Sequence, residues 1–353
     1  MYNRIKTLHA LGQKITLHYF SYNKNRNVKD LEPFCTAVFP YKRKGLLSWF
    51  PFSKPYIIAT RIDRKLIERL NNDRSPILLE GIHCTGIIPH LAYKDRIVIR
   101  MHNDEAEYYQ KLITSEKKLL RKLYFVVESF LLKKYQHRLS PDLKIICVSR
   151  SDIKVFENQY HYQRLFYIPS FLSWQEVTSK TGKGNYCMYH GNMSIAENEA
   201  AAIWLIDHVF STLRVPFIIA GKNISDKLMQ AAARYKHIRL VSNPDFSLMD
   251  KLIQDAQIHI LPSLNNTGLK LKLLHALFQG RFCITNNEGV KGTDMEDLVY
   301  VVSNRGTEYI KLIEYLFQKS FSSEEKNKRN QLLNHYNNIE NGRRLIELYS
   351  HYQ

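Results

Sequence analysis

The chain has 353 residues, a formal net charge of +18 and a pI near 9.5. This length suits two domains that each bury a core, and the charge favours an anionic partner: nucleotide phosphates, a nucleic acid or an acidic membrane surface. The five cysteines are odd in number and lack CxxC spacing, so we expect reduced thiols of a cytosolic protein. No signal peptide is visible, and the most apolar helical run, residues 123–132, is too short to cross a bilayer.

The first twenty residues predict a helix followed by a strand. Ile5, Leu8 and Leu11 form an apolar stripe, Gly12 ends the helix, and residues 15–19 alternate as in a half-buried strand. The chain therefore begins on a helix.

Residues 41–56 interleave basic and aromatic side chains. They include Lys42, Arg43, Lys44, Lys54, Trp49, Phe50 and Phe52. An anionic bilayer interface attracts this mixture, although a loop whose aromatics pack on the next helix explains it equally well. One long helix, or two in tandem, is expected between Tyr108 and Leu139, and its many lysines would give this domain one basic and aromatic side.

Two apolar strands are expected at residues 77–83 and 96–102. The second ends in His102 and is followed by the acidic turn 103–109. A lone histidine is often structural, but its place at a strand end beside an acidic turn makes a functional role an even alternative. A further strand, 144–149, precedes a helix that starts at Arg150.

The second half of the chain alternates strands and helices. Strands are expected to start at 186, 216, 237, 257, 281 and 298, as in a doubly wound domain. Gly191 and Asn192 follow the first of these strands and make a candidate phosphate cradle, before a capping box at Ser194–Glu197. Lys222 follows the second strand and can supply positive charge.

Residues 255–293 form the stretch on which the functional prediction depends. A strand, a polar loop, an amphipathic helix and a second strand predict a βαβ unit, with Gly268 opening the helix and Gly280 closing it. Ligands of such sheets bind beyond the carboxyl ends of the strands, where helix N-termini offer N–H groups to phosphate. The leucines of this helix fit an ordinary core helix, which does not explain two glycines and two lysines at this spacing.

This stretch resembles the donor-binding signature of retaining family-4 glycosyltransferases. The matching positions are Gly268, Lys270, Lys272, Leu274, Ala276, Gly280 and Thr285. The sequence departs from the signature at Thr267 and His275, where many members have glutamates that grip the donor sugar and the ribose, respectively. His275 can still form a hydrogen bond with a ribose hydroxyl.

The resemblance implies the GT-B type of α/β fold: two Rossmann-like doubly wound domains facing across a cleft. The acceptor-side domain would be residues 1–170, with the family's first strand and glycine-rich loop apparently missing. A linker at 171–184 would lead to a nucleotide-sugar-binding domain at 185–321, and a helical tail at 322–353 would pack back toward the first domain.

The implied activity is the retaining, metal-independent and cofactor-free transfer of a sugar from a nucleotide-diphosphate sugar to a glycan or lipid-linked acceptor, in surface polysaccharide or glycoconjugate biosynthesis. The expected location is the cytoplasm, with possible peripheral binding to the inner membrane face. His102 is the expected catalytic residue. The expected donor-binding residues are Gly191, Asn192, Lys222, Thr267, Gly268, Lys270, Lys272 and His275. The alternative is a non-catalytic nucleotide- or glycan-binding homologue; nucleic acid is not an expected partner, because no recognition motif is present.

Overall fold

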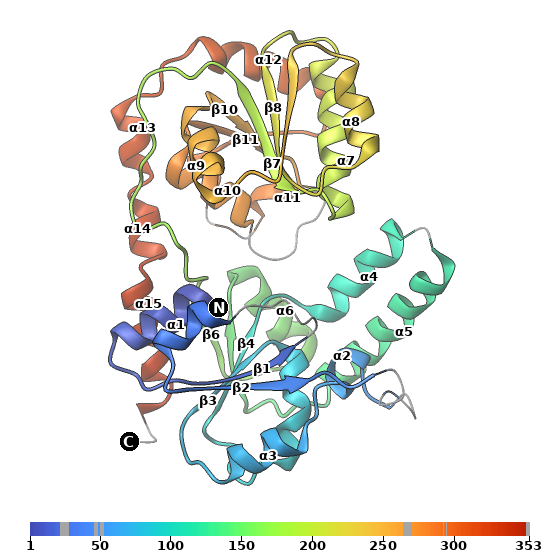
Figure 1. Ribbon diagram of the computed structural model, residues 1–353, viewed down its shortest axis with the longest axis vertical. Helices are drawn as coiled ribbons and strands as arrows, with labels where there is room; N and C mark the ends of the chain where they lie inside the picture. The colour runs from blue at the N-terminus through green and yellow to red at the C-terminus, as the bar shows by residue number, and fades with distance from the viewer. Residues whose placement is uncertain are drawn as a thin grey trace. The chain divides into compact units, whose positions relative to one another are not determined.

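The computed structural model of the chain describes residues 1–21, 28–45, 49, 53–116, 118–263, 270–291, 293 and 295–350. The chain divides into two compact units: unit 1 is Met1–Ser173 with Tyr336–Gln353, and unit 2 is Trp174–His335. Each unit is an α/β structure built on parallel strands (Figure 1). The predicted fold class of two Rossmann-like domains is confirmed.

Unit 1 contains a two-stranded and a four-stranded parallel sheet. Its strands are β1 (Thr16–Ser21), β2 (Ala37–Lys42), β3 (Ile77–Glu80), β4 (Ile97–Met101), β5 (Lys144–Cys147) and β6 (Leu165–Tyr167). β1 pairs with β2, and the larger sheet has the order β3-β4-β5-β6. Every residue of β4 and β5 is buried. Burial on both faces explains why these strands read as continuous apolar runs in the sequence.

Helices cover both faces of the larger sheet of unit 1. The helices of unit 1 are α1 (Tyr2–Ala10), α2 (Tyr56–Ala59), α3 (Arg64–Asn71), α4 (Glu105–Ser115), α5 (Leu119–Gln136), α6 (Arg150–Tyr160) and α15 (Asn338–Glu347), with the 3₁₀ helices η1 (Lys29–Phe34) and η3 (Ile82–His90). On one face Ile99 shares a core with Phe156 of α6. On the other face Val98 packs with Leu345 of α15 and Leu8 of α1. Adjacent residues of β4 thus enter different cores, as the two-residue period of a strand requires.

The segment between Tyr108 and Leu139 forms two helices, α4 and α5, which pack against each other (Figure 1). Glu128, the one acidic residue in the sequence of α5, is buried and faces α2. Its carboxylate accepts hydrogen bonds from the backbone N–H groups of Tyr56 at 2.7 Å and Ile57 at 2.8 Å.

Trp49, from the basic and aromatic segment 41–56, packs inside unit 1. Its ring lies edge-on to Tyr56 and to Tyr124 of α5, with centroids 5.6 and 5.9 Å away, and its Nε1 donates to the carbonyl of Lys54 at 3.0 Å. Packing on the neighbouring helix is therefore the correct interpretation for this tryptophan. Phe50 and Phe52 lie outside the described residues.

Unit 2 is built on a six-stranded parallel sheet with the order β12-β11-β10-β7-β8-β9. Its strands are β7 (Cys187–Asn192), β8 (Phe217–Lys222), β9 (Ile238–Ser242), β10 (Ile258–Ile260), β11 (Phe282–Asn286) and β12 (Tyr300–Val302). All six strands begin one or two residues after their predicted starts. Numbered within the unit, the order is 6-5-4-1-2-3, which is that of doubly wound dinucleotide-binding sheets. The switch point, where the strand order reverses, lies between β7 and β10.

The helices of unit 2 are α7 (Ala196–Leu205), which continues into the π-helical turn η4 (Ile206–Phe210), α8 (Asp226–Ala233), α9 (Phe246–Asp255), α10 (Leu271–Gln279), α11 (Asn287–Val290), η5 (Glu296–Leu298), α12 (Gly306–Gln318), α13 (Ser323–Lys328) and α14 (Gln331–His335). Helices α9 and α10 cover one face of the sheet, and α7 and α8 cover the other (Figure 1). Gly280 follows α10 as predicted, and a Cβ at this position would collide with the His259 ring.

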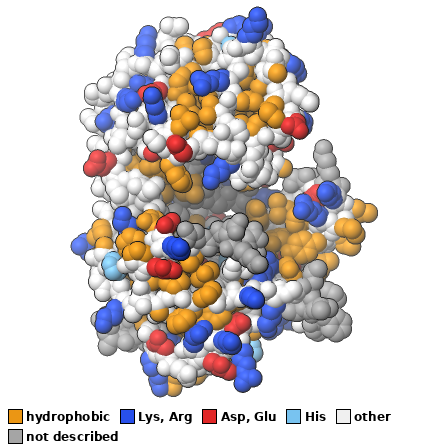
Figure 2. Space-filling view, viewed as in Figure 1, with side chains coloured by type: hydrophobic (Ala, Val, Ile, Leu, Met, Phe, Trp, Pro, Cys, Tyr) orange, Lys and Arg blue, Asp and Glu red, His pale blue; other side chains and the backbone are white. Residues whose placement is uncertain are grey.

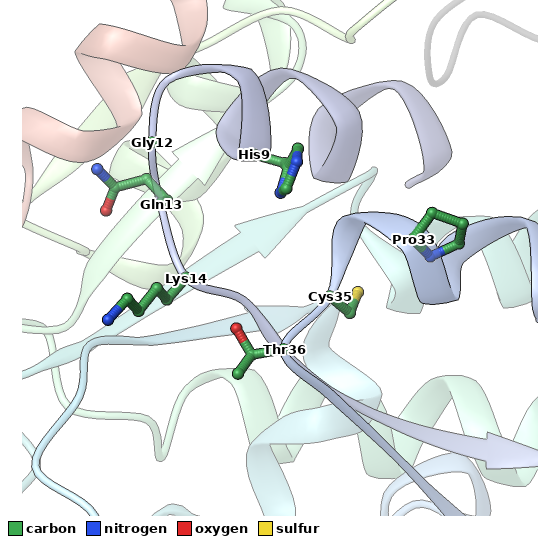
Figure 3. Close-up of a pocket in the computed structure, with 7 residues that line it drawn as sticks. All are labelled: His9, Gly12, Gln13, Lys14, Pro33, Cys35 and Thr36. Carbon is green, nitrogen blue, oxygen red and sulfur yellow. The ribbon is translucent and has the colours of Figure 1, made fainter.

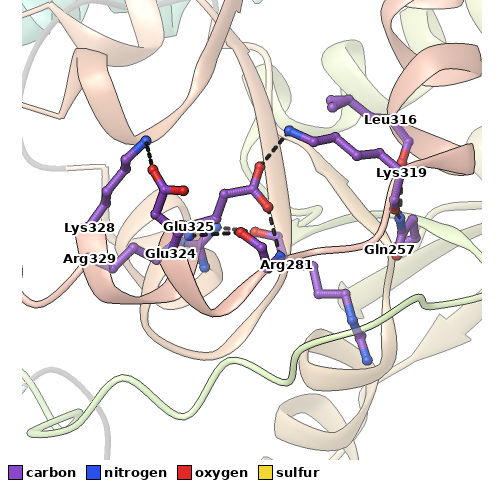
Figure 4. Close-up of polar contacts among 9 residues, drawn as sticks. Gln257, Arg281, Leu316, Lys319, Glu324, Glu325, Lys328 and Arg329 are labelled. Carbon is purple, nitrogen blue, oxygen red and sulfur yellow. Dashed lines mark hydrogen bonds and ion pairs between the residues drawn. The ribbon is translucent and has the colours of Figure 1, made fainter.

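Arg329 connects the segment after α12 to the rest of unit 2 through hydrogen bonds. Its buried guanidinium donates to the carbonyls of Leu277 at 2.9 Å and Gly280 at 2.6 Å, and to the Ser179 hydroxyl at 2.9 Å. Nearby, Glu325 of α13 pairs with Lys319 at 2.8 Å (Figure 4). The predicted tail 322–353 is thus divided: α13 and α14 belong to unit 2 and α15 to unit 1.

The structure bears on two expectations from the sequence, reduced cysteines and no membrane-crossing helix. All five cysteines are free, and three of them are buried. Among the helices of the described residues, none combines the length and the apolar composition needed to cross a membrane.

Candidate functional site

Two neighbouring strands of unit 2 carry glycines near their carboxyl ends, beside the switch point. Gly191 of β7 lies opposite Gly221 of β8, and Asn192 and Lys222 follow them in register. A Cβ at Gly221 would collide with the carbonyl oxygen of Gly191. Only glycine therefore allows the two backbones to approach this closely where a ligand of a doubly wound sheet is expected.

Asparagine side chains order the loop that follows β7. The Asn192 Oδ1 accepts from the backbone N of Ser194 at 3.1 Å and from its hydroxyl at 2.8 Å. The Asn198 amide donates to the Asn192 carbonyl at 3.0 Å. The predicted capping box at Ser194–Glu197 is wrong: α7 begins at Ala196 without a side-chain cap, because the Ser194 hydroxyl bonds to Asn192.

Lys272, the second residue of α10, reaches the same asparagine. Its Nζ donates to the Asn198 Oδ1 and to the Tyr189 hydroxyl, both at 3.2 Å, and lies 4.9 Å from the centre of the Tyr189 ring. Burial, with a smaller contribution from neighbouring Lys270, lowers the pKa of Lys272 to about 8. Since both acceptors are neutral, an anion bound here would stabilise the charged form of this lysine.

The structure describes Lys270 and Lys222 among the other predicted donor-binding residues, but not Thr267 and Gly268. Helix α10 begins at Leu271 with Lys270 as its N-cap, so the prediction that the helix opens at Gly268 is wrong. Thr267 and Gly268 themselves lie outside the described residues. Lys222 is exposed, and its carbonyl accepts from the Met193 backbone at 2.8 Å. The structure thus brings Gly191, Asn192 and Lys272 together through Asn198, with Lys222 on the adjacent strand.

His275 lies about one turn after Lys272 in α10, and its ring has polar contacts at Nε2 and an aromatic contact on its face. Its Nε2 is 2.9 Å from both the Asp250 Oδ1 and the Gln279 Oε1, and its ring stacks on Trp174 with centroids 4.3 Å apart. Burial lowers the pKa of His275, although Asp250 and Gln279 partly oppose this. Two acceptors at Nε2 place the hydrogen of the neutral ring there, so Nδ1 keeps its lone pair and can accept a hydrogen bond.

His102, the predicted catalytic residue, directly follows β4 in unit 1 and joins a network of charged side chains. Its Nε2 is 3.5 Å from the Oε2 of Glu80 at the end of β3, and its Nδ1 is 3.1 Å from the Arg100 Nη1. Arg4 of α1 forms a 2.8 Å salt bridge with Glu80. The side chains of Arg4 and Arg100 are only 4% and 5% exposed, whereas that of His102 is 45% exposed. His102 is therefore the solvent-facing member of this network.

Opposite charges stabilise Glu80 in this network. Burial alone would raise the pKa of the Glu80 carboxyl, but Arg4, His102 and Arg100 together hold it far below its ordinary value. Burial and Arg4 lower the pKa of Arg100 to about 10. Two guanidinium groups against one carboxylate leave an excess of positive charge beside His102, which suits an electron-rich group of a substrate.

A small hollow in unit 1 lies away from these strand ends (Figure 3). It is lined by His9, Gly12, Gln13, Lys14, Pro33, Cys35 and Thr36. Lys14 precedes β1 and Thr36 precedes β2, so the hollow is at the amino ends of these parallel strands. Ligands of open α/β sheets bind at the carboxyl ends, and the hollow is therefore not part of the candidate site.

Part of the chain matches a known family. Residues 184–319 match the family model described as "Glycosyl transferases group 1". This segment is a group 1 glycosyl transferase domain. It contains the whole six-stranded sheet of unit 2 together with Gly191, Lys272 and His275, so the candidate site of unit 2 belongs to the matched segment.

The wider comparisons extend over most of the chain. An "uncharacterized 44.6 kDa protein in cps region" of Klebsiella pneumoniae is 24% identical over 311 residues, which are 82% of this chain and 78% of that protein. A glycosyltransferase from Rickettsia africae has a similar structure, with a TM-score of 0.67, 12% identity, and coverage of 99% of this chain and 94% of that one. TarM gives a TM-score of 0.59 at 14% identity over 80% of this chain, which spans only 57% of TarM. The fold is that of GT-B glycosyltransferases, and the group 1 domain and the cps-region relative support a glycosyltransferase role.

Several contacts in the group 1 domain were not found from the sequence. Tyr189 and Asn198 hold Lys272, and Asp250 and Trp174 hold His275, across 25 to 101 residues of sequence. Trp174 gave the one local signal, because it is the only tryptophan in a linker rich in Ser, Thr, Lys and Gly. The others lie inside ordinary helical or strand patterns, so nothing local marked them.

Proposed function

We propose that the chain transfers a sugar, with retention of anomeric configuration, from a nucleotide-diphosphate sugar bound by unit 2 to a glycan or lipid-linked acceptor. The observation that carries this proposal is the half-buried Lys272 ammonium, which donates to neutral oxygens beside the glycines of β7 and β8. A diphosphate is the kind of anion that such a position in a doubly wound sheet accommodates.

The donor diphosphate is stabilised in this proposal without a divalent metal or a cofactor. Lys272, Lys222 and Lys270 supply positive charge, and the N-terminus of α10 adds the positive end of its dipole. Gly191 and Asn192 give the phosphates access to the backbone. Thr267 and Gly268 enter the proposed donor site through the family resemblance alone.

The ribose of the donor is proposed to contact His275. The resembling family has a glutamate at this position, and a carboxylate accepts hydrogen bonds from sugar hydroxyls. With its hydrogen on Nε2 held by Asp250, the Nδ1 of His275 offers the same acceptor function with one nitrogen. The replacement therefore keeps the chemistry that the ribose contact needs.

His102 is proposed to contact the transferring sugar from unit 1. Its Nδ1 faces Arg100, which donates, so the hydrogen of the neutral ring lies on Nε2. This Nε2–H lies 3.5 Å from the Glu80 Oε2, which is too long for a strong hydrogen bond, so it can instead donate to a sugar oxygen whose electron density rises during transfer.

The acceptor is proposed to belong to surface polysaccharide or glycoconjugate biosynthesis. The relative in the Klebsiella pneumoniae cps region supports this class of pathway. A lipid-linked acceptor would place the protein at the cytoplasmic face of a membrane as a peripheral protein, in keeping with its net charge of +18.

The proposal is tested with a panel of nucleotide-diphosphate sugars in the presence of EDTA. Release of the nucleoside diphosphate should be detected for at least one donor, and NMR of the glycoside product should show the anomeric configuration of the donor. The Lys272→Ala variant serves as the matched control and should release less. An inverted product, or release that requires a divalent metal, would contradict the proposed reaction.

The same panel separates the enzyme from a non-catalytic binding protein of the same fold. The specific observation that favours the second candidate is the engagement of His275 with Asp250 and Gln279 where the resembling family has a free carboxylate. Donor binding by calorimetry without any turnover would establish that alternative.

A further inference from the structure

Helix α5 exposes a continuous line of apolar side chains. Leu119, Leu123, Val126 and Phe130 are 81%, 60%, 46% and 66% exposed, and their spacing of four, three and four residues places them on one face of the helix. Leu120, at 83% exposure, widens this line at its start. These five residues are called the α5 stripe below.

The stripe is not the core-facing side of the helix. The opposite face of α5 carries the buried side chains of Leu132, Gln136 and Glu128. An amphipathic surface helix has one apolar face, directed at the core. A second apolar face directed at solvent calls for a partner, because exposed contiguous apolar patches mark interaction sites.

Basic side chains border the stripe on both sides. At 100° per residue, Lys122 and Lys133 lie on one side of Phe130, and Lys134 lies on the other; all three are exposed. Lys118 adds charge at the start of the helix, whereas Arg121 there pairs with Glu116 at 3.8 Å. Since Glu128 faces inward to α2, the exposed side of α5 carries positive charge only. Figure 2 shows hydrophobic side chains gathered over α4 and α5 with basic side chains among them.

We propose that the α5 stripe docks into the interface of an anionic bilayer, with Lys122, Lys133 and Lys134 among the lipid headgroups. An apolar line that inserts between acyl chains, bordered by cations alone, is complementary to anionic lipid in both polarity and charge. The inference deepens the proposed function, on which it rests for the lipid-linked acceptor that docking would bring within reach.

Two side chains of the 41–56 segment, those of Arg43 and Trp49, are held within unit 1. Trp49 packs against Tyr124 of α5, and the Arg43 guanidinium donates to the Thr60 hydroxyl at 2.8 Å and lies 4.5 Å from the Tyr56 ring centre. Side chains held in this way within unit 1 support α5 from behind.

The test is co-sedimentation of the full chain with vesicles of phosphatidylglycerol and phosphatidylcholine, compared with phosphatidylcholine alone. The wild type should bind the anionic vesicles, and binding should fall as salt rises. Leu123→Ser with Phe130→Ser should weaken binding about tenfold or more. Lys133→Ser with Lys134→Ser should weaken it about fivefold for each charge. A double variant of α12, Lys311→Ser with Tyr315→Ser, removes the same kinds of exposed side chain and should bind like the wild type.

The experiment distinguishes the bilayer from other partners. Circular dichroism checks that each variant is folded, and analytical ultracentrifugation checks its association state. No preference for anionic vesicles, or equal binding by the wild type and the Leu123→Ser/Phe130→Ser variant, would overturn the proposal. A dimer that this variant dissociates would assign the stripe to a second copy of the chain instead. Because the vesicle assay contains no nucleotide-sugar, a failure to bind vesicles would not count against the proposed sugar transfer. A failure to transfer sugar would likewise not count against binding of the α5 stripe to the bilayer.

Discussion

The two units differ in how they neutralise the charged side chains of their candidate sites. In unit 1, Glu80 at the end of β3 pairs with Arg4 and lies 3.9 Å from Arg100, so the network supplies its own counter-charges. In unit 2, Lys272 donates to the neutral oxygens of Tyr189 and Asn198. A carboxylate paired with two guanidinium groups stabilises the fold, whereas a half-buried cation with neutral hydrogen-bond partners can still gain from an anionic ligand. Substitutions in unit 1 should therefore affect stability first, and those in unit 2 should affect ligand affinity first.

The largest effect is expected at Glu80. Glu80→Gln leaves two buried guanidinium groups without a carboxylate and should destabilise unit 1 by about 3–5 kcal/mol, as removal of one partner of a buried ion pair does. Urea unfolding followed by circular dichroism measures this loss. The exposed pair of Glu68 and Arg64 provides the control, since Glu68→Gln should change stability by less than about 0.5 kcal/mol. Equal stabilities of the two variants would show that the network does not support the fold.

The same carboxylate predicts a direction of pH dependence. Because the folded pKa of Glu80 is depressed, its stabilisation is fully present above the unfolded value of about 4.5 and is lost as pH falls below it. Urea midpoints measured between pH 7 and pH 3 should therefore fall more for the wild type than for Glu80→Gln. Parallel curves for the two proteins would remove Glu80 from the acid sensitivity.

His102 sharpens the comparison, because it belongs to the network of unit 1 but faces solvent. His102→Ala should lower turnover about 100-fold, the scale of a misplaced reacting group. The affinity for the nucleoside diphosphate should stay the same, because unit 2 is proposed to bind it. Single-turnover kinetics and calorimetry separate the two quantities. A parallel loss of both, or loss of the folded state, would make His102 a structural residue.

Lys272 should show the opposite pattern from Glu80. Lys272→Ala should weaken nucleoside diphosphate binding by about 1–3 kcal/mol, the contribution of a charged hydrogen bond, with little loss of stability. Since burial lowers the pKa of Lys272 to about 8, the wild type should bind more weakly as pH rises above that value. The variant should lose this pH dependence. Calorimetric titrations at pH 7 and pH 9 provide the measurement, and unchanged affinity in the variant would exclude Lys272 from the site.

The smallest effect is expected at the partner of His275. Asp250→Asn removes the charged acceptor that keeps the hydrogen of His275 on Nε2, and should weaken binding of the ribonucleotide by about 1 kcal/mol. Of the 2′-deoxy and 3′-deoxy nucleotides, the one that lacks the hydroxyl bound by Nδ1 should lose less. A uniform loss for all three ligands would indicate a packing effect through Trp174 instead.

The sequence predicted the elements of both units well, because buried parallel strands leave apolar runs such as 144–149 and 216–221. It also predicted a strand that ends near Gly191, where the structure shows a close backbone approach to Gly221. The start of α10 at Leu271 was not predicted, because a glycine at 268 is only one of several places where a helix can begin. The predicted capping box is wrong because the Ser194 hydroxyl forms a hydrogen bond with the Asn192 side chain instead of capping α7.

The charge networks could not be predicted, since they depend on tertiary contacts. Arg4 and Glu80 are 76 residues apart, and Lys272 and Tyr189 are 83 apart. The exposed α5 stripe is a similar case. Leucines at helical spacing normally indicate a core, and only the folded structure shows that Leu123 and Phe130 lie on the outer face while Glu128 lies on the inner one.

The central claim is that the Lys272 site of unit 2 binds the diphosphate of a nucleotide-sugar. Calorimetric titration of the wild type with a panel of nucleoside diphosphates and the corresponding nucleosides, in EDTA, tests it most directly. The account predicts saturable one-site binding of at least one diphosphate, much weaker binding of its nucleoside, and a loss of diphosphate affinity in Lys272→Ala. No binding by any diphosphate, or equal binding by the wild type and Lys272→Ala, would contradict it.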